Sequence, residues 1–155
     1  MELNELLVNR LIELGYKIVT AESCTGGLLA SKIVEVSNAS KVFDMSFVTY
    51  SNEAKINLIG VSEELIKNYG VVSEEVAKDM AVKAAKVANA EVGVGISGIA
   101  GPTGATPNKP IGMVCFGFYI NGKTYSETQF FGEIGRTNVR NSSVLFSLKY
   151  LLEKL

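Results

Sequence analysis

One stretch of the chain decides the fold: residues 18–34 read Ile18-Val19-Thr20-Ala21-Glu22-Ser23-Cys24-Thr25-Gly26-Gly27-Leu28-Leu29-Ala30-Ser31-Lys32-Ile33-Val34. Its first part is short and apolar, as in a buried strand, and its last part resembles a helix. The turn between them carries two hydroxyls and a thiol beside the free N–H groups that a helix presents at its first turn. The stretch therefore predicts a strand-to-helix turn that displays nucleophile-type groups.

Helices and strands are expected on both sides of this turn. Leucines at helical spacing predict a first helix closed by Gly15, and the helix after the turn is expected to end near Asn38. Ser51, Ser62 and Ser73 are predicted N-caps. Further helices are expected at Asn52–Ile59, after Ser62, at Glu74–Ala88 and at the C-terminus, where apolar residues from Val144 to Leu155 share one side. Strands are expected at Lys17–Ala21, Val42–Tyr50, Val92–Ile96, Ile111–Ile120 and Lys123–Phe131.

The order of these elements indicates the fold class. Strands alternate with helices until Asn121-Gly122, a strong hairpin signal, joins the last two strands. This order predicts a three-layer α/β/α fold, with helices on both faces of a mixed, mostly parallel five-stranded sheet in which one strand is antiparallel. Residues 1–155 contain no linker or repeat and are expected to form a single domain.

Composition excludes several classes of protein. The net charge of −1 gives no electrostatic reason to expect a nucleic acid or an anionic membrane as partner. No apolar run approaches the roughly 20 residues that span a bilayer, and the N-terminus lacks the basic region of a signal peptide. Two cysteines without a CxxC pair predict neither a disulfide framework nor a zinc site. We expect a cytoplasmic protein that binds no metal.

The Ser23 turn has a functional and a structural interpretation. Open α/β sheets bind ligands at the carboxyl ends of their strands, which favours Ser23 as a nucleophile, with Cys24 as the alternative. Serine and threonine are also ordinary N-caps, and a lone cysteine is often apolar filling. The chain has no histidine, so any base that activates Ser23 must be a lysine, a carboxylate or water.

Three other segments are expected at strand ends or beside them. Tyr50 and Lys55 could reach the same crevice, where desolvation would lower the pKa of a lysine, although Lys55 read alone is an exposed helix residue. Ser97 and Gly98 open a glycine-rich loop suited to an oxyanion or phosphate, or to a plain surface connection.

Arginines near the start of the last helix form the third segment. Arg136 and Arg140 oppose the helix dipole there, which hints at an anionic partner, although a solvated arginine is the simpler interpretation. The sequence Gly93-Val94-Gly95-Ile96-Ser97-Gly98 fits G-x-G-x-x-G, but its first glycines lie inside a strand and no helix follows. We therefore reject a dinucleotide site and expect these glycines to permit close backbone approach.

Together these segments resemble the CinA C-terminal domain family, the nicotinamide-nucleotide amidases of bacterial pyridine-nucleotide salvage. Three motifs carry the resemblance in order and spacing across nearly the whole chain: Ala21-Glu22-Ser23-Cys24-Thr25-Gly26-Gly27, Val48-Thr49-Tyr50-Ser51-Asn52-Glu53-Ala54-Lys55 and Gly95-Ile96-Ser97-Gly98-Ile99-Ala100-Gly101-Pro102. Larger members carry a further N-terminal domain, so this chain resembles the stand-alone form. Gly132-Glu133-Ile134-Gly135-Arg136 replaces the shorter Gly-Asp-Arg of many members.

The resemblance implies that the chain hydrolyses nicotinamide mononucleotide (NMN) to nicotinic acid mononucleotide and ammonia, without a cofactor. It implies Ser23 as nucleophile, Lys55 as base, Tyr50 as a residue that assists or orients the pair, and Ser97 as a hydrogen-bonding residue of the catalytic centre. Arg136 or Arg140 would bind phosphate or the oxyanion.

Amide hydrolysis also needs an oxyanion donor, which backbone N–H groups at Cys24, Thr25 and Gly26 could supply. The alternatives are a non-catalytic nucleotide-binding regulatory module and an amidohydrolase of another small amide. We expect a homodimer.

Overall fold

The computed structural model describes all 155 residues and contains one five-stranded sheet in the order β2-β1-β3-β4-β5. The strands are β1 (Ile18–Glu22), β2 (Phe47–Val48), β3 (Val92–Gly98), β4 (Met113–Ile120) and β5 (Lys123–Phe130). β1 is parallel to β2 and β3, whereas β4 is antiparallel to both of its neighbours. The predicted mostly parallel sheet with one antiparallel strand is therefore confirmed.

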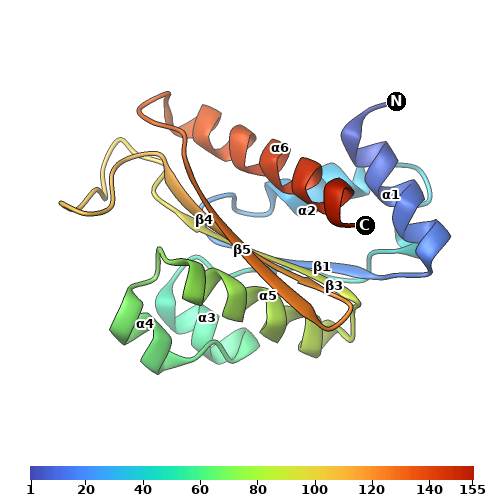
Figure 1. Cartoon of the computed structure of the whole chain (residues 1–155), viewed down its shortest axis with the longest axis horizontal. Helices are drawn as coiled ribbons and strands as arrows, with labels where there is room; N and C mark the ends of the chain where they lie inside the picture. The colour runs from blue at the N-terminus through green and yellow to red at the C-terminus, as the bar shows by residue number, and fades with distance from the viewer.

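Helices cover both faces of the sheet, which confirms the three-layer fold (Figure 1). One layer contains α1 (Leu3–Leu14), α2 (Leu28–Val34) and the long C-terminal α6 (Arg136–Lys154). The other contains α3 (Asn52–Ile59), α4 (Glu63–Tyr69) and α5 (Glu74–Ala88). A short 3₁₀ helix, η1 (Ala39–Lys41), follows α2.

The two faces of the sheet are packed differently. The face under α1, α2 and α6 holds the larger apolar cluster, which includes Phe116 and Phe118 of β4. On the other face, a Cβ atom at Gly95 or Gly117 would overlap the Ala77 carbonyl of α5. These glycines therefore let α5 lie directly on the central strands, as expected for Gly95, and a side chain there would push the helix away.

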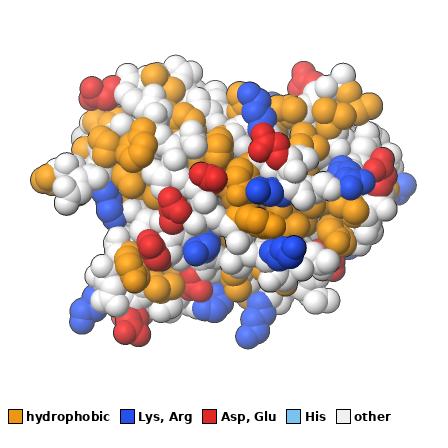
Figure 2. All heavy atoms as spheres, viewed as in Figure 1, with side chains coloured by type: hydrophobic (Ala, Val, Ile, Leu, Met, Phe, Trp, Pro, Cys, Tyr) orange, Lys and Arg blue, Asp and Glu red, His pale blue; other side chains and the backbone are white.

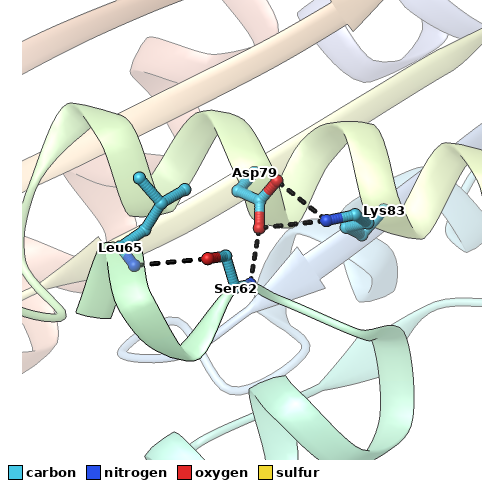
Figure 3. A network of polar contacts seen from close by, with 4 residues as sticks. All are labelled: Ser62, Leu65, Asp79 and Lys83. Atoms are coloured by element: carbon cyan, nitrogen blue, oxygen red, sulfur yellow. Dashed lines mark hydrogen bonds and ion pairs between the residues drawn. The ribbon is translucent and has the colours of Figure 1, made fainter. Parts of the chain in front are cut away.

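Serine caps define the starts of α3, α4 and α5, as the sequence predicts. Ser51, Ser62 and Ser73 each accept the backbone N–H of the residue three positions later. At Ser62 the backbone N–H also donates to Asp79 of α5, 2.8 Å away, and Asp79 pairs with Lys83 (Figure 3). The cap of α4 is therefore tied to α5.

Several predicted boundaries are wrong. The strand expected at Val42–Tyr50 is reduced to the two residues of β2, because the Ser46 hydroxyl accepts the Thr20 N–H and so replaces a ladder hydrogen bond. The second helix ends at Val34 instead of near Asn38, whose φ of +69° starts η1. β4 begins at Met113 instead of Ile111, after Gly112 with φ +88°.

Acidic and basic side chains are both spread over the face of the molecule shown in Figure 2, and neither sign covers it alone. This distribution accompanies the net charge of −1. None of the helices is both long and apolar enough to cross a membrane.

Candidate active site

The residues predicted at the carboxyl ends of β1, β2 and β3 come together around a pocket of about 200 Å³. Ser23 follows β1 and Tyr50 lies just beyond β2. Ser97 and Gly98, predicted to open the loop, are instead the last two residues of β3. The lining consists of Ser23, Cys24, Tyr50, Lys55, Val71, Val72, Ser97, Gly98, Ala100 and Arg136. Parallel strands thus bring segments that are far apart in the sequence to one edge of the sheet.

Lys55 and Ser23 form a direct contact in the wall of this pocket. Lys55 projects from the first turn of α3, and its Nζ lies 3.2 Å from Ser23 Oγ. Its side chain is completely buried, so the interpretation as an exposed helix lysine is wrong. The other acceptors of Nζ are the carbonyl oxygens of Thr49 at 2.7 Å and Tyr50 at 3.4 Å. Lys55 therefore has only uncharged partners.

Burial changes the acidity of Lys55. Because the ammonium is desolvated and has no carboxylate beside it, its pKa falls to about 8. At pH 7 a lysine with this pKa is neutral in roughly a tenth of molecules. In the neutral amine the two N–H groups can donate to Thr49 and Tyr50, which leaves the lone pair for the Ser23 hydroxyl. The arrangement suits a base that takes the serine proton.

The Ser23 turn leaves the backbone donors of Cys24, Thr25 and Gly27 without an acceptor in the protein. Gly26 N–H is used, since it donates to the Ser23 carbonyl at 3.1 Å, so the prediction of a free donor at Gly26 is wrong. The N–H groups of Cys24 and Thr25 donate to no protein atom. Two adjacent free N–H groups beside a hydroxyl are the donors that an oxyanion needs.

Glu22 belongs to the first sequence motif, and in the structure it caps the start of α2. Its buried carboxylate accepts the N–H groups of Leu29 and Ala30, both at 2.9 Å, in the first turn of α2. These donors are therefore not free, contrary to the expectation for this helix. The signal in the sequence was an acidic residue at the end of the predicted strand, shortly before a helix whose N-cap position is a glycine.

The Cys24 thiol is placed as a neutral group. Its side chain is buried, and desolvation raises the pKa of the thiol to about 11. A thiol reacts as a nucleophile through its thiolate, which is scarce at neutral pH with this pKa. The geometry and the charge state therefore favour Ser23 over Cys24.

Other predicted site residues line the pocket without touching the Ser23–Lys55 pair through their side chains. Tyr50 offers its backbone carbonyl to the pair, while its hydroxyl accepts Arg136 Nη2 at 2.9 Å. The buried Ser97 hydroxyl donates to the Val71 carbonyl at 2.7 Å. A Cβ atom at Gly98 would overlap Val114, so this position requires glycine for packing.

The two arginines occupy different places. Arg136 is exposed, lines the pocket and donates to the Gly101 carbonyl at 2.8 Å. Arg140, one turn further along α6, does not line the pocket and donates to the carbonyls of Cys24 and Thr25. Neither forms an ion pair with a carboxylate.

A second pocket of about 380 Å³ adjoins the first and shares Ala100 and Arg136 with it. A larger hollow of about 560 Å³ lies elsewhere, between the start of α1, α2 and α6, and has no nucleophile with a base beside it. No three His, Cys, Asp or Glu side chains gather as metal ligands would. The chemistry-bearing groups are thus concentrated at the smaller pocket.

Comparison with known proteins shows the family of the chain. A family model described as the CinA C-terminal domain matches residues 1–155. A CinA-like protein of Kosmotoga olearia is 49% identical over 154 residues, which is 99% of this chain but 37% of that protein, so the chain spans little more than a third of that relative.

Solved structures of similar proteins have the same fold. A competence-damaged protein (CinA) superfamily protein from Escherichia coli is 37% identical with a TM-score of 0.95, over 99% of this chain and 88% of that one. A competence/damage inducible protein from Agrobacterium tumefaciens is 38% identical with a TM-score of 0.91, over 99% and 96% of the two chains.

Proposed function

The chain belongs to the CinA C-terminal domain family, and we propose that it is an amidohydrolase that converts NMN to nicotinic acid mononucleotide and ammonia. One observation carries the proposal: a buried lysine with no carboxylate partner lies 3.2 Å from a serine hydroxyl. A lysine in such surroundings can act as a base near neutral pH, and Ser-Lys pairs are an established alternative to Ser-His.

The reaction follows from these groups. Neutral Lys55 takes the proton of Ser23 as the serine oxygen attacks the amide carbon, and the N–H groups of Cys24 and Thr25 stabilise the oxyanion. Lys55 then returns the proton to the departing nitrogen, so ammonia leaves and an acyl ester remains on Ser23. Water, deprotonated by Lys55, attacks the ester to form a second tetrahedral intermediate. Collapse of this intermediate releases the carboxylate, and the proton from Lys55 restores the Ser23 hydroxyl.

The choice of NMN rests on the family resemblance and on Arg136. NMN combines a planar aromatic amide with a phosphate, and Arg136 is an exposed arginine without a carboxylate partner where the two pockets meet. With the amide at Ser23, the phosphate can extend toward the second pocket and pair with the Arg136 guanidinium.

The test is ammonia release from NMN by purified protein, with Ser23→Ala and Lys55→Met compared to wild type. We expect each variant to lose at least about 10³-fold in kcat, as when a nucleophile or its base is removed. Ser31→Ala and Lys67→Met are matched controls on exposed positions of α2 and α4 and should retain activity.

Three results would change the proposal. Full turnover by Ser23→Ala would show that Ser23 is not the nucleophile. Saturable NMN binding without ammonia release would favour a regulatory module instead. Ammonia release from asparagine or glutamine but not from NMN would keep the mechanism and replace the substrate.

A further inference from the structure

We propose that Arg140 is a positioning residue that holds the Ser23 turn in the shape of an oxyanion hole, and that it does not bind the anionic group of the substrate. This inference rests on the proposed amidohydrolase function. It separates the roles of two arginines that the sequence could not distinguish.

Arg140 reaches from α6 to the turn with two donors. Its Nε donates to the Cys24 carbonyl at 3.0 Å, and its Nη2 donates to the Thr25 carbonyl at 2.9 Å. The planar guanidinium presents these two N–H groups in a fixed fork, so it fixes two neighbouring carbonyls at once. The preceding residue, Val139, is fully buried, which anchors this turn of α6 on the core.

The planarity of the peptide bond passes this constraint to the free donors. A carbonyl and the N–H of the next residue belong to one trans peptide unit and point in opposite directions. Binding of the Cys24 carbonyl by Arg140 therefore directs the Thr25 N–H to the side away from the arginine. Ser23 and Cys24 line the pocket, and Arg140 does not. Because Thr25 follows these two residues in the turn, we infer that its N–H is set on the pocket side without contact between Arg140 and the substrate.

The second donor, Cys24 N–H, is oriented by the same contact between Arg140 and the turn. The Thr25 carbonyl held by Arg140 shares its peptide unit with Gly26 N–H, which donates to the Ser23 carbonyl. That carbonyl in turn shares its peptide unit with Cys24 N–H. Arg140 therefore orients the Thr25 donor directly and the Cys24 donor through one further hydrogen bond.

Arg136 has the opposite arrangement. It lines both pockets, and its partners are the Gly101 carbonyl and the Tyr50 hydroxyl. Both partners are neutral, so an anionic group can replace either one at this exposed guanidinium. The geometry thus gives substrate contact to Arg136 and preorganisation of the turn to Arg140.

Arg140→Lys is the decisive variant, because it keeps the charge and loses the fork. The loss of one well-placed oxyanion donor costs on the order of 10²-fold in kcat. We expect a loss of this size with little change in KM, since the oxyanion exists only after attack. Arg136→Lys is the matched control and is expected to raise KM for NMN.

Two substrates separate positioning from phosphate binding. Nicotinamide riboside has the same amide and ribose as NMN but no phosphate. If Arg140 positions the turn, Arg140→Lys lowers kcat/KM by the same factor for both substrates. A loss confined to NMN would assign Arg140 to the phosphate and overturn the inference.

A readout that needs no activity completes the test. In ¹H–¹⁵N spectra, Arg140→Lys is expected to shift and broaden the amide signals of Cys24 and Thr25, while distant signals report an intact fold. Unchanged Cys24 and Thr25 signals would overturn the inference. If wild-type protein hydrolyses neither substrate, the proposed amidohydrolase function fails, and these two signals alone decide whether Arg140 holds the turn.

Discussion

Two lysines in the same helical layer have opposite surroundings. Lys83 of α5 pairs with Asp79 one turn earlier in its own helix, and its side chain is 32% exposed (Figure 3). Lys55 of α3 is fully buried and has two carbonyls and a hydroxyl as its only partners. One lysine is compensated by a charge, and the other is not.

This difference distinguishes a lysine in a structural ion pair, Lys83, from a lysine that can act as a base, Lys55. A carboxylate beside a buried lysine would stabilise the ammonium and remove its ability to act as a base. The molecule instead buries Lys55 at a cost to folding, because desolvation disfavours the charged form. Residues held in an unfavourable state by their surroundings are frequent at functional sites.

The cost of burying Lys55 should be visible in the pH dependence of stability. The pKa of Lys55 is about 8 in the folded protein and ordinary in the unfolded chain, near 10.4. Between these values the unfolded chain binds more protons, so the free energy of unfolding rises with pH. Relative to Lys55→Met, wild type should gain about 2–3 kcal/mol between pH 7 and pH 10, measured by urea denaturation.

The same denaturation measurement can contradict this prediction. A stability difference between wild type and Lys55→Met that stays constant with pH would mean that the lysine is not desolvated. Lys83→Met serves as the comparison at pH 7, where loss of its partly exposed ion pair should cost less than about 1 kcal/mol.

The rate of the proposed reaction should rise with pH. The active form contains neutral Lys55, so kcat/KM for NMN should increase about tenfold per pH unit below pH 8 and level off above it. A series of initial rates from pH 6.5 to 9.5, corrected for hydrolysis without enzyme, measures this. A plateau already present at pH 6.5 would point to a carboxylate as base, since an ordinary glutamate titrates near 4.3.

The sequence predicted the fold well because the fold depends on local signals. Serine caps, the Asn121-Gly122 hairpin and alternating strands and helices each report on a few residues, and all agree with the structure. The strand around Phe47 was predicted too long because its apolar composition does not reveal that the Ser46 side chain replaces the backbone ladder. A side chain that competes with the backbone has no distinct pattern in composition.

The structure brings Ser23, Tyr50, Lys55 and Ser97 to one pocket as predicted, whereas Thr25, Gly26 and Arg140 do not line it. The order of the elements could place Ser23 and Lys55 at one sheet edge, but the burial of Lys55 and its carbonyl partners depend on tertiary packing. Likewise, Glu22 and Arg140 act on peptide groups of the Ser23 turn, and the sequence does not show which donors remain free.

The smallest expected effect on activity comes from substitution of Ser62, a serine before a helix as Ser23 is. Ser62 accepts the Leu65 N–H as the cap of α4, so Ser62→Ala should lower the free energy of unfolding by about 1 kcal/mol and leave the proposed amidase activity within twofold. The Ser23 hydroxyl accepts no backbone N–H, because Glu22 holds the first turn of α2, but it is a hydrogen-bond partner of the buried Lys55 Nζ. Ser23→Ala removes this partner of a buried donor and should therefore lower the free energy of unfolding by a similar amount, about 1 kcal/mol, while it abolishes turnover of the proposed reaction. Urea denaturation and ammonia release on the same two variants compare their stability and their activity. A much larger stability loss in Ser23→Ala than in Ser62→Ala would show that the Ser23 hydroxyl supports the fold as well as the reaction.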